Sequence, residues 1–147
     1  MASIIDVAKY ILDKCGSMTT MKLQKLCYYS QAWFLAWNEL PMFDEDFEAW
    51  ANGPVCPGLF RLHRGRFIVS SDEMPQLSGE HSLNENEKET IDKVISYYGD
   101  KDAHWLSELT HKELPWKSAR ERAGAAPGEP CSEIVTKESM MEYYSGL

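Results

Sequence analysis

Cysteine and histidine are the side chains of this chain best suited to chemistry, and there are four of each. They are Cys15, Cys27, Cys56, Cys131, His63, His81, His104 and His111. Cys56 precedes a Pro-Gly pair that opens a predicted helix, where a thiolate would be stabilised. His63 lies seven residues further on and could act as its base. Because no other residue completes an oxyanion site, the pattern does not favour a catalytic cysteine.

The same residues are poorly spaced for a metal site. The chain has no CxxC pair, no HExxH motif and no histidine pair at i,i+4. His104 and His111 are seven residues apart on one predicted helical face, a poor match to known ligand spacings. The GxSxG, P-loop and GxGxxG motifs are also absent. We therefore expect a protein that is not an enzyme and has no metal site and no cofactor.

Charge and composition favour a protein partner. The formal net charge of −8 disfavours nucleic-acid binding and would speed the encounter with a basic protein. One basic cluster stands out, and it comprises Arg61, His63, Arg64 and Arg66, interleaved with Leu59, Phe60 and Leu62. The pattern is typical of an amphipathic surface helix, and arginine is also frequent at protein interfaces.

The element that must organise these residues is a long apolar helix over Met21–Trp37. Its apolar residues, including Leu23, Leu26 and Trp37, cover nearly all sides, so other elements must surround it. Lys22 and Lys25 lie in its first turns, where the helix dipole disfavours cations. We expect them to be solvated, and the alternative is that they meet an acidic group elsewhere.

Around this helix the pattern predicts a mainly α, compact single domain over residues 1–147, with a small two- or three-stranded β element. Helices are expected at 3–14, 59–65, 84–99, from 102, at 117–123 and from 136, and short strands within 43–51 and 67–70. The two extended pieces flank the 59–65 helix and could pair with each other. Residues 70–82 and 124–130 are predicted loops. Cys27 and Cys15 are interpreted as reduced core residues.

The N-terminal region has no secretory signal, and the long apolar run is interrupted by Ser30 and Gln31. We therefore expect a soluble, cytoplasmic protein without membrane contact.

The stretch MTTMKLQKLCYYSQAWFLAWNELPMFDEDFEAWANGPVCPGLFR resembles the signature of the Panacea domain, the SocA-like or GepA-like group of bacterial and prophage proteins. The matching features include KLQKLxYY and EAWxxGPV. Later, Leu106–His111 and Pro115–Arg120 resemble the LSxxTHxExPWxxA region of the family. The resemblance covers residues 3–123, and residues 131–147 lie beyond it as a candidate added helix.

The resemblance implies an antitoxin of a toxin–antitoxin system, which neutralises its toxin by direct protein binding. The alternatives are a phage or prophage counter-defence inhibitor of a host enzyme, and an adaptor that delivers its partner to an ATP-dependent protease. No catalytic residue is implied. The oligomeric state and the role of the C-terminal tail stay open.

For the partner surface we expect polar or basic groups that lie beside aromatic side chains. These are Lys22, Lys25, Trp50, Asn52, Phe60, Arg61 and Arg64.

Overall fold

The computed structural model describes residues 1–74 and 83–147 of the chain. Seven α-helices and five short β-strands lie in these residues. The predicted loop at 70–82 falls largely outside them, and its described start is a 3-10 turn, η1 (Ser71–Glu73). The expectation of a mainly α fold with a small β element is confirmed.

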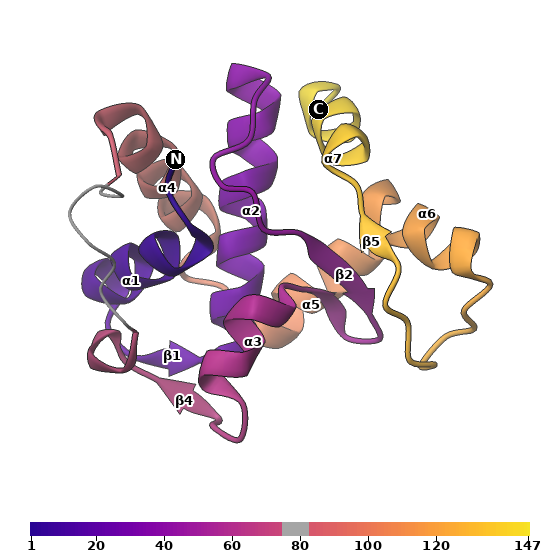
Figure 1. Cartoon of the computed structure of the whole chain (residues 1–147), viewed down its shortest axis with the longest axis horizontal. Coiled ribbons are helices and arrows are strands. Elements are labelled where there is room, and N and C mark those ends of the chain that lie inside the picture. Colours follow the sequence, from indigo (N-terminus) through magenta and orange to yellow (C-terminus); the bar gives the residue numbers. More distant parts are fainter. Residues whose placement is uncertain (75–82) are drawn as a thin grey trace.

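The central helix is α2 (Thr20–Asn38), and it is buried in an unbroken run from Leu23 to Ala32. Four helices pack against it: α1 (Ile4–Cys15), α4 (Glu85–Tyr98), α5 (Ala103–Lys112) and α7 (Lys137–Ser145). Figure 1 shows α1 and α4 on one side of α2 and α7 on the other. A helix that is apolar nearly all round is stable because it is enclosed in this way.

Two residues expected in the core lie at helix ends and are exposed instead. Trp37 is 50% exposed in the last turn of α2, where Lys93 Nζ lies 5.2 Å from the centre of its ring. Cys15 is the last residue of α1 and is also exposed. In both cases the helical period places the residue correctly, but the neighbouring elements do not extend far enough to cover it.

The helix starts follow the capping residues in the sequence. Ser3 and Asp6 form a capping box at α1, and Asn84 and Glu87 form another at α4. Thr19 accepts a hydrogen bond from Lys22 N and caps α2. Asp102 and Thr136 cap α5 and α7 in the same way.

The β element consists of two separate sheets. In the first, β2 (Phe47–Trp50) lies between β3 (Gly53–Val55) and β5 (Ile134–Val135), all antiparallel. In the second, β4 (Ile68–Val69) pairs with β1 (Met18–Thr19). The prediction that the two extended pieces flanking α3 (Pro57–His63) pair with each other is therefore wrong. The residues just before α2 take up the edge of β4 instead.

The C-terminal tail packs on the core. Met140 and Tyr144 of α7 are buried, and α7 lies against α2. The chain reaches α7 from α6 (Leu114–Ala123) through β5. Within the described residues, no helix combines the length and the apolar character that crossing a bilayer would require.

Candidate functional site

The β2–β3 hairpin and α3 form a groove that contains three of the predicted partner-binding residues. Its volume is about 690 Å³. It is lined by Met21, Gln24, Glu48, Trp50, Ala51, Asn52, Val55, Phe60, His63, Gly128, Pro130, Cys131 and Ser132. The rings of Trp50 and Phe60 meet edge to face with centroids 5.0 Å apart. The structure therefore brings Trp50, Asn52 and Phe60 together, although the loop at 128–132 was not expected beside them.

Strand alternation explains why Trp50 faces outward. In β2, Phe47 and Ala49 are buried whereas Glu48 and Trp50 are half-buried, because successive side chains point to opposite faces. The Trp50 indole N–H donates to Glu48 Oε1 at 2.8 Å, which fixes the ring on the outer face. Trp50 is thus held as a rigid aromatic surface at the mouth of the groove.

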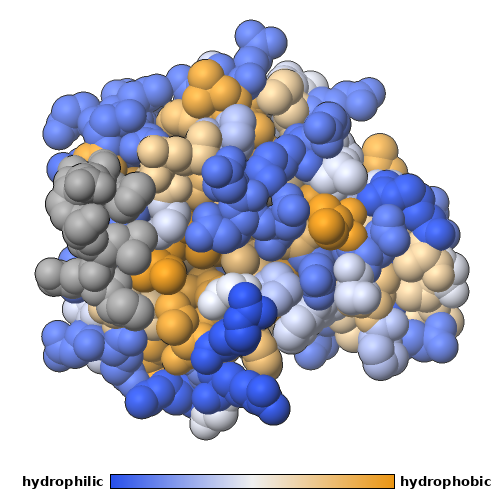
Figure 2. Space-filling model, viewed as in Figure 1, coloured by the Kyte–Doolittle hydropathy of each residue, from blue (hydrophilic) through white to orange (hydrophobic). Residues whose placement is uncertain are grey.

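The basic residues lie beside the groove, at the corner between α3 and β4. Arg61 and Arg64 are exposed, as expected for a surface helix, and Arg66 forms an ion pair with Glu73. Phe67 and Ile68 follow at once and are 75% and 51% exposed. Figure 2 shows apolar surface between polar side chains over this part of the molecule. The predicted strand at 67–70 gives no indication of this apolar exposure.

Lys22 does not join this surface. Its Nζ donates to the Gly99 carbonyl at 2.6 Å, and Gly99 ends α4. A cation at a helix C-terminus is favourable, since the helix dipole is negative there. The partner of Lys22 is therefore a backbone carbonyl of another helix and not the expected solvent.

The expectation that Lys25 is solvated is wrong. Its side chain is 0% exposed, and its Nζ has no hydrogen-bond partner in the described residues. It lies beneath Gly53 and beside Thr110, so β3 and α5 cover it. Burial lowers the pKa of its ammonium to about 8. The charge of Lys25 predicted exposure, and no residue near it in the sequence indicates that β3 and α5 cover it.

Cys56 and His63 both contact Gln24, which holds them in place. Gln24 Oε1 accepts from Cys56 N at 2.9 Å, and its Nε2 lies 3.0 Å from His63 Nε2. Cys56 is the N-cap of α3, as the sequence suggested. Burial nevertheless raises the pKa of its thiol, and the amides of Leu59 and Gly58 offset this only in part. Burial also disfavours the charged form of His63, and so lowers the pKa of its imidazole. Burial therefore works against the stabilised thiolate that a cysteine nucleophile needs.

Two of the three remaining histidines lie in the described residues. The His111 ring stacks on Trp116 with centroids 4.1 Å apart, while His104 is exposed and His81 lies outside the described residues. In residues 1–74 and 83–147, no three His, Cys, Asp or Glu side chains are placed to hold a metal ion.

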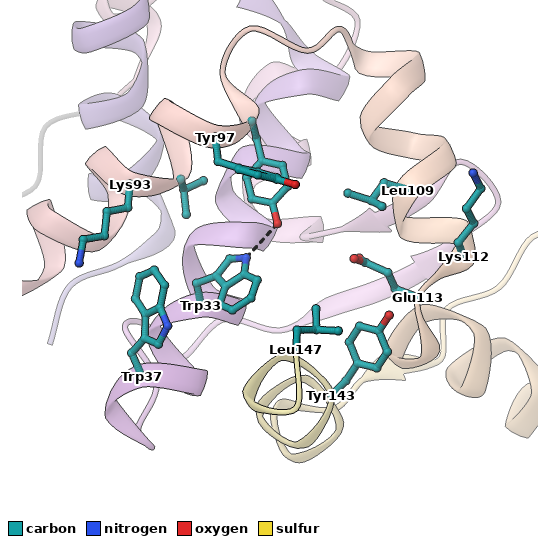
Figure 3. A pocket seen from close by; sticks show the side chains of 11 residues that line it. Trp33, Trp37, Lys93, Tyr97, Leu109, Lys112, Glu113, Tyr143 and Leu147 are labelled. Atoms are coloured by element: carbon teal, nitrogen blue, oxygen red, sulfur yellow. Dashed lines mark hydrogen bonds between the residues drawn. The ribbon is translucent and has the colours of Figure 1, made fainter.

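A second pocket, of about 600 Å³, lies between α2, α4, α5 and α7 and was not expected (Figure 3). It is lined by Trp33, Trp37, Lys93, Val94, Tyr97, Tyr98, Leu109, Lys112, Glu113, Tyr143 and Leu147. The Trp33 indole N–H donates to the Tyr98 hydroxyl at 2.9 Å. In the sequence, Trp33 and Trp37 recur one helical turn apart, but on a helix that must be enclosed this spacing predicts core packing.

Comparison with known proteins defines the family. The profile described as Antitoxin SocA-like, Panacea domain, matches residues 23–117. The chain belongs to this family of antitoxin domains. It is similar to Antitoxin SocA of Caulobacter vibrioides (strain NA1000 / CB15N), with 29% identity over 124 residues. That match covers 75% of this chain and 66% of the relative, slightly less than two thirds of its length. No solved structure matches the chain.

Proposed function

We propose that this chain neutralises a protein toxin by binding it directly through the groove of β2, β3 and α3 and the adjoining basic corner. Membership of the SocA-like antitoxin family is the observation that carries the proposal. Neutralisation of this kind requires no chemistry in the antitoxin, because covering the active surface of a toxin is sufficient.

The surface has the composition of a protein interface. The Trp50 and Phe60 rings provide aromatic anchors, and Arg61 and Arg64 are exposed beside them. A standard interface buries about 800 Å² on each partner. The accessible surface of the chain is 7524 Å², so such a contact would take roughly a tenth of it.

Co-expression with the product of the neighbouring gene tests the proposal. We expect the chain to restore growth in cells that make this toxin and to copurify with it. Arg61→Ala combined with Arg64→Ala should weaken both effects. Lys14→Ala combined with Lys88→Ala removes the same charge from α1 and α4 and should leave both effects intact. A toxin that remains lethal beside folded antitoxin would reject the proposal.

The half-life of the toxin in cells distinguishes direct binding from delivery to a protease. Direct neutralisation predicts that the half-life of the toxin is unchanged or longer when the chain is present. Faster loss of the toxin in cells with an ATP-dependent protease would point to an adaptor instead. Capture of a host enzyme encoded elsewhere would point to counter-defence.

A further inference from the structure

The pocket between α2, α4, α5 and α7 combines aromatic walls with a buried carboxylate. Trp33, Trp37 and Tyr97 are among its walls, and the faces of such rings attract cations. Glu113 lies at its base and is only 6% exposed. Figure 3 shows the Glu113 carboxyl group pointing into the space bounded by Trp33, Leu109 and Leu147.

Within residues 1–74 and 83–147, only one oxygen of Glu113 accepts a hydrogen bond. Oε1 accepts from the Tyr29 hydroxyl at 2.7 Å and from the Tyr144 hydroxyl at 2.6 Å. Among the described residues, Oε2 accepts no hydrogen bond, and Glu113 forms no salt bridge. A carboxylate has about four acceptor positions, so the free oxygen can still accept donors from a ligand. A buried carboxylate without a cation is also costly, which favours a cationic ligand.

The lysines at the rim leave the centre of the pocket available. Lys93 forms a salt bridge with Glu89 at 3.4 Å, and its Nζ lies over the Trp37 ring. In Figure 3 the ammonium groups of Lys93 and Lys112 both point away from Glu113. Neither lysine therefore takes the place of a counter-ion.

We propose that this pocket receives an arginine side chain of the protein partner, with Glu113 as its counter-ion. A guanidinium group is planar, stacks on aromatic rings and donates two parallel hydrogen bonds to a carboxylate. Its aliphatic stem would lie along Leu109 and Leu147. The net charge of −8 also favours a basic partner segment. This inference rests on the proposed function, because the arginine belongs to the protein partner.

The test uses a probe and not the toxin. Nα-acetyl-arginine methylamide is titrated into the full chain, and the indole N–H resonances are followed by NMR. We expect the resonances of Trp33 and Trp37 to shift, with a Kd of about 1 mM for a ligand of this size. Trp50 and Trp116, which lie outside this pocket, should not respond. The citrulline analogue has the same shape without the charge and should bind at least about tenfold more weakly.

Glu113→Gln should abolish the preference for arginine over citrulline, because the amide keeps an acceptor for the two tyrosines but loses the charge. Glu108→Gln is the matched control, since it removes one exposed charge from α5 outside the pocket. Tyr97→Ala removes a wall that is 66% exposed and makes none of the bonds to Glu113. It should weaken binding of the arginine amide by at least about threefold. This variant tests the proposal even if Glu113→Gln fails to fold.

Equal shifts with the arginine and citrulline amides would overturn the proposal. The absence of any shift up to about 20 mM probe would do the same, given the affinity expected for this ligand size. These results do not depend on the toxin. A chain that binds the arginine amide but does not rescue growth would reject the proposed function while leaving the pocket in place.

Discussion

Gly53 of β3 lies directly against the buried side chain of Lys25. A Cβ atom built on Gly53 would come within 2.5 Å of Lys25 Cε and 3.1 Å of Lys25 Nζ. The backbone of Gly53 also has φ of 120°, a conformation that other residues rarely adopt. The hairpin that presents Trp50 therefore closes onto α2 only because position 53 has no side chain.

This contact predicts that Gly53→Ala destabilises the protein by about 2–4 kcal/mol, from backbone strain and a clash together. Lys25→Ala removes the closest contact, the one with Lys25, but leaves the strain and a contact of 3.0 Å with Thr110 Oγ1. The cost of Gly53→Ala should therefore be smaller by at least about 1 kcal/mol in the Lys25→Ala background. Urea unfolding of the four proteins measures this coupling. The same cost in both backgrounds would show that the two residues do not meet.

Lys25 also predicts a pH dependence of stability. Burial lowers its pKa from 10.5 to about 8 in the folded protein. Below pH 8 the folded state holds an unpaired ammonium, at a cost of about 3 kcal/mol. As the pH rises from about 8 to 10.5 the unfolded chain binds more protons than the folded chain, so this cost is progressively relieved.

Lys25→Met isolates this effect, because it keeps the aliphatic stem and removes the charge. At pH 7 the variant should be more stable than the wild type by about 1–3 kcal/mol, and the difference should shrink towards pH 10. Ionisation of tyrosines and cysteines occurs in both proteins and largely cancels in the difference. Urea unfolding at a series of pH values provides the measurement. A difference that is independent of pH would mean that Lys25 is not buried as an ammonium.

The docking of α7 depends on the buried hydroxyl of Tyr144. It donates to Glu113 Oε1 at 2.6 Å and lies 3.2 Å from the Tyr28 hydroxyl. Tyr144→Phe should therefore cost about 1.5–3 kcal/mol in unfolding free energy, as expected for a hydrogen bond to a charged group. Tyr143→Phe is the control, because the Tyr143 hydroxyl makes no hydrogen bond in the described residues and Tyr143 is only half-buried. Its cost should stay within about 0.5 kcal/mol. Equal costs for the two variants would contradict the structure.

Local signals in the sequence were sufficient to predict most of the helices. The caps at Ser3, Thr19, Asn84, Asp102 and Thr136 all begin helices in the structure. Capping depends on hydrogen bonds within three residues, so it can be identified without tertiary information. The burial of α2 was also predictable from its own residues, because a helix that is apolar on nearly all sides must be enclosed by other elements.

The misjudged features depend on contacts distant in sequence. Lys25 is covered by Gly53 and Thr110, and nothing near Lys25 indicates either of them. The pairing of β4 with β1 was missed because two-residue strands have almost no pattern of their own. The pocket around Glu113 is formed by side chains from α2, α4, α5 and α7. The two tyrosines that donate to Glu113, Tyr144 and Tyr29, are 31 and 84 residues away from it in the chain. Trp50 and Phe60, by contrast, are joined by one hairpin and one helix, and their meeting was predictable.

The most direct test of the account is the affinity between the purified chain and the product of the neighbouring gene, measured by isothermal titration calorimetry. We predict saturable binding that is weakened at least about tenfold by Arg61→Ala with Arg64→Ala, which corresponds to about 1.4 kcal/mol. Lys14→Ala with Lys88→Ala should leave the Kd within about threefold, since surface charges away from an interface contribute little. The absence of binding between two folded proteins would contradict the account, as would an equal loss of affinity in both double variants.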